Sequence, residues 1–221
     1  MKKIFLFFLL LTIFSCDNDD TEVIIIIDDT AVYKIVFDAN WTTQTHPINY
    51  PSNAHFSWMV GVTHSEQNVL FAKGLLASAG IELMAETGET DLLASEIDTK
   101  IVNNKALEYK IGNVINGDGI DEITINASVD YPLFSWVSMI APSPDWFVAN
   151  SNIPLIVNDE WIDQIELEVF LFDAGTDSGT DFTSPDNDTN PKEPIFLIAE
   201  PPLGNGLTVS PSVGKIIITK Q

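Results

Sequence analysis

The segment "WIDQIELEVFLFDAG" (residues 161–175) has the cleanest alternation of apolar and polar residues in the chain. Its apolar side falls at Ile165, Leu167, Val169 and Leu171, and glutamates fill the opposite side. A period of two is typical of a β-strand with one buried face, because successive side chains of a strand point to opposite sides. The segment therefore predicts a strand at the surface of a β-layer.

Other segments rich in β-branched and aromatic residues predict further strands, at 31–39, 55–63, 106–115, 120–129, 133–141, 193–200 and 214–220. Short helical turns are predicted within 65–89 and a helix within 89–104, and the stretches 141–155 and 175–194 are predicted to be loops. Many strands and few helices favour an all-β fold. We expect one antiparallel β-sandwich over residues 31–221, with short helical insertions.

The N-terminus has the pattern of an export signal. "MKK" precedes the apolar run "IFLFFLLLTIF", which is too short to span a bilayer. The run ends at "IFSC", which resembles the bacterial lipobox, although Phe14 departs from the small residue usual there. Residues 1–15 are thus predicted to be a lipoprotein signal peptide, and Cys16 the lipidated N-terminus. Residues 16–30 are predicted to form an acidic tether that can include a first strand.

The charge of the chain narrows its partners. With 32 acidic residues against 10 lysines, the formal charge is −22. Such a surface repels nucleic acid and anionic lipid, so we expect no nucleic-acid partner and membrane contact only through the anchor. It attracts divalent cations and basic partners. Cys16 is the single cysteine, so no disulfide can form within one chain.

Two of the loops carry carboxylates next to strand ends. "PSPD" places Asp145 after the strand that ends at residue 141, and "DAGTDSG" places Asp173 and Asp177 after the strand that ends at residue 172. If the two strands run in the same direction, both loops emerge at one end of the sandwich. Calcium prefers six to eight oxygen ligands, which three carboxylates, loop carbonyls and water can supply. The alternative is that Asp173 and Asp177 are turn residues that accept hydrogen bonds from their own backbone.

The same loops carry a family resemblance. "APSPDWFV", followed by "DAGTDSG", resembles the N-terminal spondin domain of F-spondin and mindin. "DANWTTQTHPINYPSNAHFSWMVGVTHS", "GLLASAGIELMAETGE" and "FTSPDNDTNPKEPI" are similar to other parts of that domain, so the resemblance covers residues 31 to 220.

The resemblance implies a β-sandwich similar to C2 domains, with a calcium ion at one end held by Asp145, Asp173 and Asp177. Animal members also use a glutamate from the strand before the proline loop. The position that matches it here is Asn126, which brings no charge and suggests weaker binding or recruitment of Asp130. The animal proteins act outside cells in adhesion and matrix recognition.

The sequence gives weaker support to an enzymatic or a carbohydrate-binding function. "FLFDAGT" and "TDSG" partly resemble protease motifs, but neither motif is complete. The residues around His46 and His64 are not typical of a catalytic general base. We expect both histidines to be hydrogen-bonded core or loop residues, and the protein not to be an enzyme. Five tryptophans raise a carbohydrate-binding alternative, although core packing explains them more simply. Trp146, beside the acidic loop, is the best candidate for a ligand contact.

The sequence thus predicts a lipid-anchored, extracytoplasmic, calcium-binding module for adhesion or recognition, located at the outer membrane or the cell surface. Its partner would be an extracellular protein or glycan. A glycan-binding lipoprotein with a purely structural calcium, or a hydrolase, are the alternatives.

Overall fold

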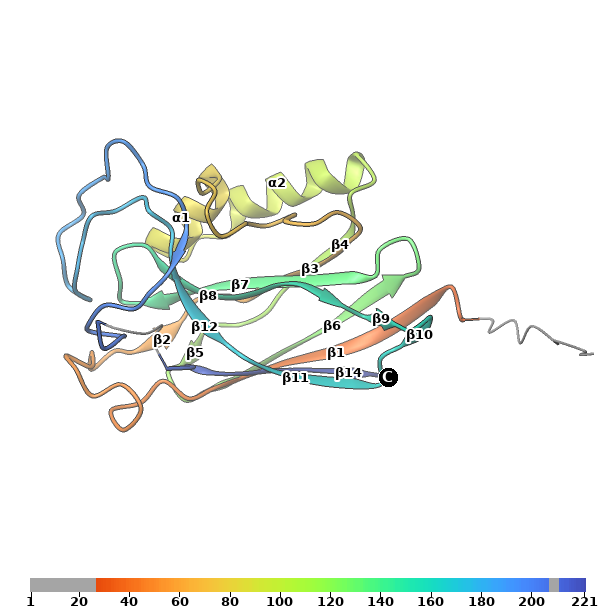
Figure 1. Ribbon diagram of the computed structural model, residues 1–221, viewed down its shortest axis with the longest axis horizontal. Helices are drawn as coiled ribbons and strands as arrows, with labels where there is room; N and C mark the ends of the chain where they lie inside the picture. The colour runs from red at the N-terminus through yellow and green to blue at the C-terminus, as the bar shows by residue number, and fades with distance from the viewer. Residues whose placement is uncertain (1–26, 207–210) are drawn as a thin grey trace, which may run out of the picture.

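A computed structural model describes residues 27–206 and 211–221 of the protein. Two antiparallel sheets face each other (Figure 1). The first sheet has the strand order β11 (Gln164–Glu168), β14 (Gly214–Lys220), β1 (Thr30–Ala39) and β6 (Ile120–Ser128).

The second sheet runs through β13 (Phe196–Leu197), β12 (Phe170–Asp173), β8 (Trp146–Pro154) and β7 (Leu133–Ala141). Beyond β7 it divides into β3 (Val60–His64) with β4 (Ala106–Ile111), and β2 (His55–Phe56) with β5 (Ile115–Asn116). A separate small hairpin joins β9 (Ile156–Val157) and β10 (Glu160–Trp161).

Two layers of apolar side chains hold these parts together. The larger one fills the space between the sheets and includes Tyr33, Phe37, Trp136 and Ile216. The smaller one lies between the second sheet and the helices α1 (Ala79–Thr87) and α2 (Asp91–Val102), which cover its outer face (Figure 1). The expected all-β sandwich with short helical insertions is confirmed.

The alternating segment 161–175 is not a single strand. The chain leaves the first sheet after β11 and joins the second sheet at β12, with Val169 between them. Ile165 and Leu167 pack against the same inter-sheet core that contains Val169 and Leu171, as the alternation predicts. A crossing strand keeps its apolar side inward in both sheets because the two sheets share one core.

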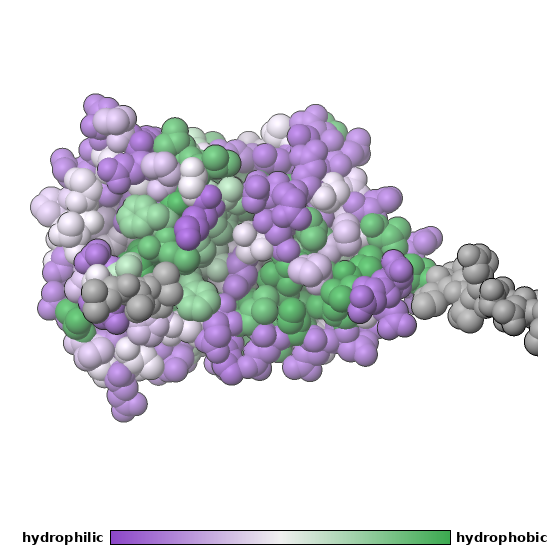
Figure 2. All heavy atoms as spheres, viewed as in Figure 1, coloured by the Kyte–Doolittle hydropathy of each residue, from purple (hydrophilic) through white to green (hydrophobic). Residues whose placement is uncertain are grey.

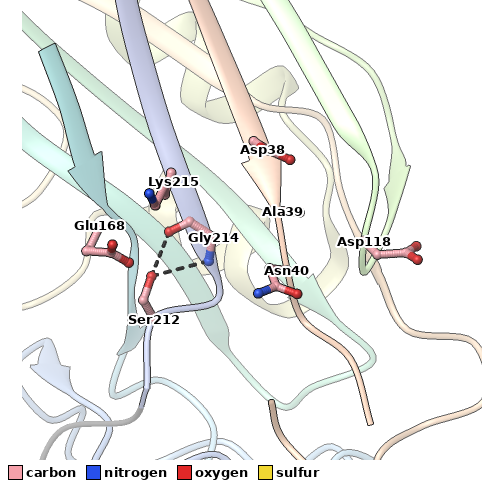
Figure 3. A pocket seen from close by; sticks show the side chains of 8 residues that line it. All are labelled: Asp38, Ala39, Asn40, Asp118, Glu168, Ser212, Gly214 and Lys215. Carbon is pink, nitrogen blue, oxygen red and sulfur yellow. Dashed lines mark hydrogen bonds between the residues drawn. The ribbon is translucent and has the colours of Figure 1, made fainter. Parts of the chain in front are cut away.

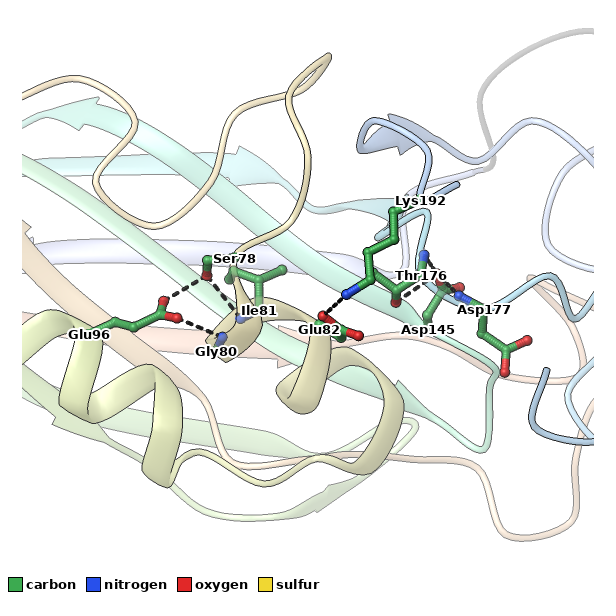
Figure 4. Close-up of polar contacts among 9 residues, drawn as sticks. All are labelled: Ser78, Gly80, Ile81, Glu82, Glu96, Asp145, Thr176, Asp177 and Lys192. Atoms are coloured by element: carbon green, nitrogen blue, oxygen red, sulfur yellow. Dashed lines mark hydrogen bonds and ion pairs between the residues drawn. The ribbon is translucent and has the colours of Figure 1, made fainter. Parts of the chain in front are cut away.

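Helix α1 is fixed at both ends. Ser78 caps it by accepting a hydrogen bond from Ile81 N–H (3.2 Å), and Glu96 of α2 accepts from Ser78 Oγ (2.6 Å) and Gly80 N–H (2.8 Å) (Figure 4). Gly88 ends the helix in the left-handed conformation (φ 77°). The last turn of α1 therefore has a defined position above the second sheet.

Several predictions about local structure were wrong. Residues 146–154, expected to be a loop, form β8, which lies between β7 and β12. The polar run that suggested a loop is accommodated because Asn150 Oδ1 accepts from Trp136 Nε1 (3.1 Å) and Asn152 N–H donates to Ser135 Oγ (2.8 Å). The strand expected at 55–63 is broken into β2 and β3, and Trp58, expected in the core, lies between them and is 44% exposed.

Hydrophilic residues cover most of the face seen in Figure 2, with apolar residues gathered along its middle. The predicted signal peptide, Cys16 and nearly all of the acidic tether lie outside the described residues. Within the described ranges, no helix is long and apolar enough to cross a membrane.

Candidate functional site

Both acidic loops emerge at one end of the sandwich. β7 is antiparallel to β8, and β8 is antiparallel to β12, so β7 and β12 run in the same direction. The loop after β7 carries Asp145, β12 ends at Asp173, and the loop after β12 carries Asp177. The start of β1 and the C-terminus lie at the opposite end (Figure 1).

Asp145 is the centre of this site and is fully buried. Its Oδ2 accepts hydrogen bonds from the N–H groups of Thr176 (2.7 Å) and Asp177 (3.1 Å) and from Thr176 Oγ1 (3.3 Å). Its Oδ1 has no hydrogen-bond partner among the described residues. Burial raises the pKa of Asp145 against these hydrogen bonds, which lower it. A buried carboxylate oxygen with no donor is costly, and a cation would offset that cost.

Asp173 is a half-buried acid beside it. Its Oδ1 accepts from Gly175 N–H (2.8 Å), and its Oδ2 accepts from Trp146 Nε1 (3.1 Å). Burial and the charge of Asp145 raise the pKa of Asp173 to about 7. Two carboxylates that oppose each other's ionisation in this way favour a shared proton or a bound cation between them.

Asp177 contributes its backbone to Asp145 and directs its carboxylate elsewhere (Figure 4). Asp177 Oδ1 accepts from Gly179 N–H (2.6 Å), and Oδ2 accepts from Asn187 N–H (2.9 Å). Asp173 and Asp177 are therefore turn residues, as the alternative interpretation predicted, since each carboxylate accepts a hydrogen bond from the N–H group two residues further along the chain. That interpretation does not account for Asp145, whose free oxygen belongs to no turn.

The acidic loop, residues 174–195, is held in a single shape. Gly175 has φ 73°, and a Cβ there would lie 2.2 Å from the carbonyl oxygen of Glu193. A Cβ on Gly179 would lie 2.6 Å from Pro144 Cγ of the neighbouring loop. Lys192 forms an ion pair with Glu82 of α1 (Figure 4), so the loop is also tied to the helix layer.

Glu86, in the last turn of α1, is a site residue that the sequence analysis missed. Burial raises the pKa of its carboxyl, and the charges of Glu82, Asp145 and Asp177 raise it further, while a hydrogen bond with Thr176 lowers it. A small cavity of about 170 Å³ lies here, lined by Glu86, Thr87, Ser143, Pro144, Asp177, Ser184 and Asp186. The segment that contains Glu86 is similar to part of the family domain. The spacing of apolar residues along a helix does not, however, indicate which loops the helix faces, so it could not assign Glu86 to the site.

Asn126 does not lie with the three aspartates. It is exposed on β6, where its N–H and Nδ2 donate to Glu108 Oε1 (2.6 and 2.9 Å). Its carbonyl accepts from Thr63 Oγ1, and Thr63 pairs with Phe134, seven residues before the end of β7. That separation is about 24 Å along a strand. The matching of Asn126 to a calcium ligand was wrong because β6 runs toward the other end of the sandwich, where Asp130 also lies in the β6–β7 connection.

Trp146 is 4% exposed and packs edge-on against Phe182, so its ring is closed to an external ligand. The expectation that Trp146 is a ligand contact was wrong, and its role is to donate to Asp173. His46 and His64 are buried and hydrogen-bonded, to Thr45 and Pro211 and to Glu66 and Ser135 respectively, as expected.

A larger cavity of about 450 Å³ lies at the ends of β1, β11 and β14, and three acids line it, Asp38, Asp118 and Glu168 (Figure 3). Glu168 and Asp118 stand on opposite sides of it (Figure 3). No carboxylate of this cavity is buried, so none needs a cation to offset its charge. The loops around Asp145 remain the better candidate.

Among the described residues, no three His, Cys, Asp or Glu side chains already stand in a geometry that could hold a metal ion. The carboxylate of Asp177 accepts hydrogen bonds within its own loop, so Asp145 and Asp173 are the two acids most available to a cation. The donor set nevertheless fits a hard cation. Its candidate side-chain donors within residues 27–206 and 211–221 are carboxylate oxygens, one of which is buried and unpaired.

The raised pKa of Asp173 gives a pH prediction for the protein in chelator. Between pH about 4 and about 7, the folded state holds a proton on Asp173 that the unfolded state releases. This contribution is present below pH 4 and is lost as the pH rises through 7. Discounted for partial exposure, it amounts to about 1 to 2 kcal/mol, or a melting shift of about 3 to 6 °C. Melting of wild type and Asp173→Asn from pH 5 to 8 measures it. The wild type should lose stability relative to the variant, and a constant difference would contradict the assignment.

The fold and the site together define a class of domain, an antiparallel β-sandwich with helices on one face and an acidic loop pair at one end. The family model described as Spondin_N matches residues 31–202. The chain belongs to the spondin N-terminal domain family.

Known relatives match only in part. The chain is 32% identical to spondin-1 of Mus musculus over 174 residues, which are 75% of this chain and 21% of that protein. It is 32% identical to spondin-2 of Homo sapiens over 173 residues, which are 76% of this chain and 52% of that protein. The chain therefore spans about a fifth to a half of the length of these relatives.

Proposed function

We propose that the protein is a calcium-binding module for extracellular adhesion or recognition. The observation that carries the calcium part is the unpaired, buried Oδ1 of Asp145 beside Asp173, whose pKa is raised by burial and by the charge of Asp145. Calcium, when bound, would supply the positive charge that these two carboxylates lack. Asp145 and Asp173 would hold it first, and Glu86 and Asp177 line the adjoining space.

The chain's own groups prepare this site. The N–H groups of Thr176 and Asp177 fix one oxygen of Asp145, so the other oxygen keeps its direction. Trp146 and Gly175 fix Asp173 in the same manner. Asp177 would join the ligands by releasing Gly179 and Asn187, whose hydrogen bonds it now accepts. Extracellular calcium modules bind with dissociation constants of about 10⁻⁴ to 10⁻³ M, and we expect the same range here.

Direct calcium binding tests the proposal through Glu86. Removing its charge with Glu86→Gln should weaken calcium binding about three- to tenfold, because the carboxyl interacts with both Asp145 and Asp177. Glu89→Gln is the matched control, since it removes the same charge three residues further along and lines a different cavity. Calorimetric titration with calcium compares the two. No binding by the wild type would refute the calcium site, and equal weakening by both variants would refute the role of Glu86.

The adhesion or recognition part rests on family membership, since the resemblance implies that animal members act in this way. We infer that the partner is an extracellular protein or glycan and that the protein is not an enzyme. We further propose that Cys16 carries a lipid and anchors the protein at the outer membrane or cell surface. The described chain enters β1 at the end opposite to the acidic loops, so the site would face away from the membrane (Figure 1).

The anchor has its own test. Cys16→Ala removes the thiol that would receive lipid, so the variant should leave the membrane fraction or remain unprocessed, with complete loss of fatty-acid label. Metabolic labelling of wild type and variant with a radioactive fatty acid measures this. Absence of label from the wild type would refute the lipid anchor without touching the calcium site.

A further inference from the structure

Trp58 is the exposed member of a set of tryptophans that are otherwise buried. It is 44% exposed, whereas Trp41, Trp136, Trp146 and Trp161 are each less than 9% exposed. Exposing a large aromatic ring to water forgoes the stabilisation that its burial would give. A solvent-facing indole in a hollow is therefore a candidate contact for a ligand.

The ring lies in a cavity of about 420 Å³ that is separate from the acidic loops. Trp58 forms one side of it, Ile111 at the end of β4 another, and the turn between α1 and α2, with Glu89, Thr90 and Asp91, the third. None of these residues is a candidate calcium ligand.

The wall that carries Trp58 is rigid. The neighbouring Ser57 donates its N–H to the carbonyl of Met139 (3.0 Å), and its Oγ accepts from Met139 N–H (2.9 Å). A Cβ on Gly88 would lie 3.0 Å from Ser57 Cβ, so the end of α1 packs closely against Ser57. A preformed cavity of this kind loses little conformational entropy when it binds.

The charged groups of the cavity are both acceptors. Glu89 and Asp91 form no ion pair within residues 27–206 and 211–221, and no lysine lines the cavity. Carboxylates accept hydrogen bonds and donate none, so they match a group that only donates. A lysine ammonium has three donors and no acceptor, and it is attracted to the face of an indole ring.

We propose that this cavity, formed by Trp58, Glu89 and Asp91, binds a lysine side chain of a basic protein partner. The methylene stem of the lysine would lie along Ile111 and the ring, and the ammonium would meet the two carboxylates. The charge of −22 on the chain would draw a basic partner toward it. Sugar hydroxyls can also donate to carboxylates, but they carry no positive charge to offset the two negative charges.

The probe for the test is a nine-residue peptide of alternating glycine and lysine, and its control is the same peptide with every lysine acetylated. Acetylation keeps the stem and removes the charge. The indole N–H signals of ¹⁵N-labelled protein are followed in chelator, with the Trp58 signal assigned from Trp58→Phe. The lysine peptide should shift the Trp58 signal, and the acetylated peptide should not. A Trp58 signal that responds to a mixture of neutral oligosaccharides and not to the lysine peptide would overturn the proposal in favour of a glycan.

Variants separate this cavity from the general charge of the surface. Trp58→Ala should weaken lysine-peptide binding about fivefold, and Glu89→Gln with Asp91→Asn by at least as much. The matched control is Asp159→Asn with Glu160→Gln, which removes two exposed acids near the β9–β10 hairpin. The proposal is overturned if the control pair weakens binding as much as the cavity pair.

Discussion

Asp145→Asn is expected to have opposite effects on stability in chelator and in calcium. In chelator the variant should melt about 3 °C or more above the wild type, because it removes a buried charge whose Oδ1 has no donor and which opposes the ionisation of Asp173. Calcium at about ten times its dissociation constant should raise the wild type by about 3 to 6 °C, since such binding adds roughly 1.4 kcal/mol. The variant should show no calcium-dependent rise. Melting curves of both proteins, in chelator and in calcium, measure the difference between their melting temperatures in each condition.

Asp130→Asn is the control for this prediction. It removes one charge from the connection at the far end of the sandwich, so its calcium-dependent rise should equal that of the wild type. Asp181 lies just beyond "DAGTDSG" but is a poorer control. Its carboxyl accepts hydrogen bonds from Asn49 Nδ2 (3.1 Å) and Phe182 N–H (2.8 Å), so its removal would disturb the loop. An Asp145→Asn protein that melts below the wild type in chelator would show that Asp145 stabilises the loop without a cation.

Gly175→Ala is expected to destabilise the protein by about 3 kcal/mol, which corresponds to a fall of about 6 to 12 °C in melting temperature. Two causes add. The left-handed backbone at φ 73° disfavours a side chain, and the new Cβ would lie 2.2 Å from the backbone oxygen of Glu193. Since Glu193 N–H donates to the carbonyl of Gly175 (2.8 Å), the two segments cannot separate without losing that bond.

Gly74→Ala isolates the first cause, the left-handed backbone. Gly74 has φ 87°, and a Cβ there would meet nothing within 4 Å, so only the backbone term of about 1 kcal/mol applies. The expected fall is about 2 to 4 °C. Equal losses in the two alanine variants would mean that the close approach of residues 175 and 193 does not hold the acidic loop.

Local patterns predicted most of the fold. The strands at 133–141 and 214–220 begin and end where their β-rich composition does. The alternation of 161–175 predicted the buried face correctly but not the change of sheet at Val169, because a period of two is the same on either side of the crossing. Strand β8 was missed because its composition suggests a loop. Asn150 makes its hydrogen bonds to residues far away in the sequence, and local composition cannot reveal such contacts.

The site was predictable where a motif lies next to a strand end. Asp145 follows β7 and Asp173 ends β12, and the parallel direction of those two strands brings the two acids together. Glu86 could not be found in this way, because it reaches the loops from a helix whose position depends on the packing of α1 against the second sheet. The assignment of Asn126 to the calcium site was wrong because matching a position along the sequence does not show at which end of the sandwich that residue lies.

An anomalous difference map from a crystal of the protein grown in calcium tests the central claim most directly. We expect one peak with calcium–oxygen distances of about 2.3 to 2.6 Å to the carboxylates of Asp145 and Asp173. The Oδ1 atom of Asp145 that now lacks a partner should be among the ligands. Absence of a peak there, at calcium concentrations of several millimolar, would contradict the account, and so would a peak confined to the cavity of Asp38, Asp118 and Glu168.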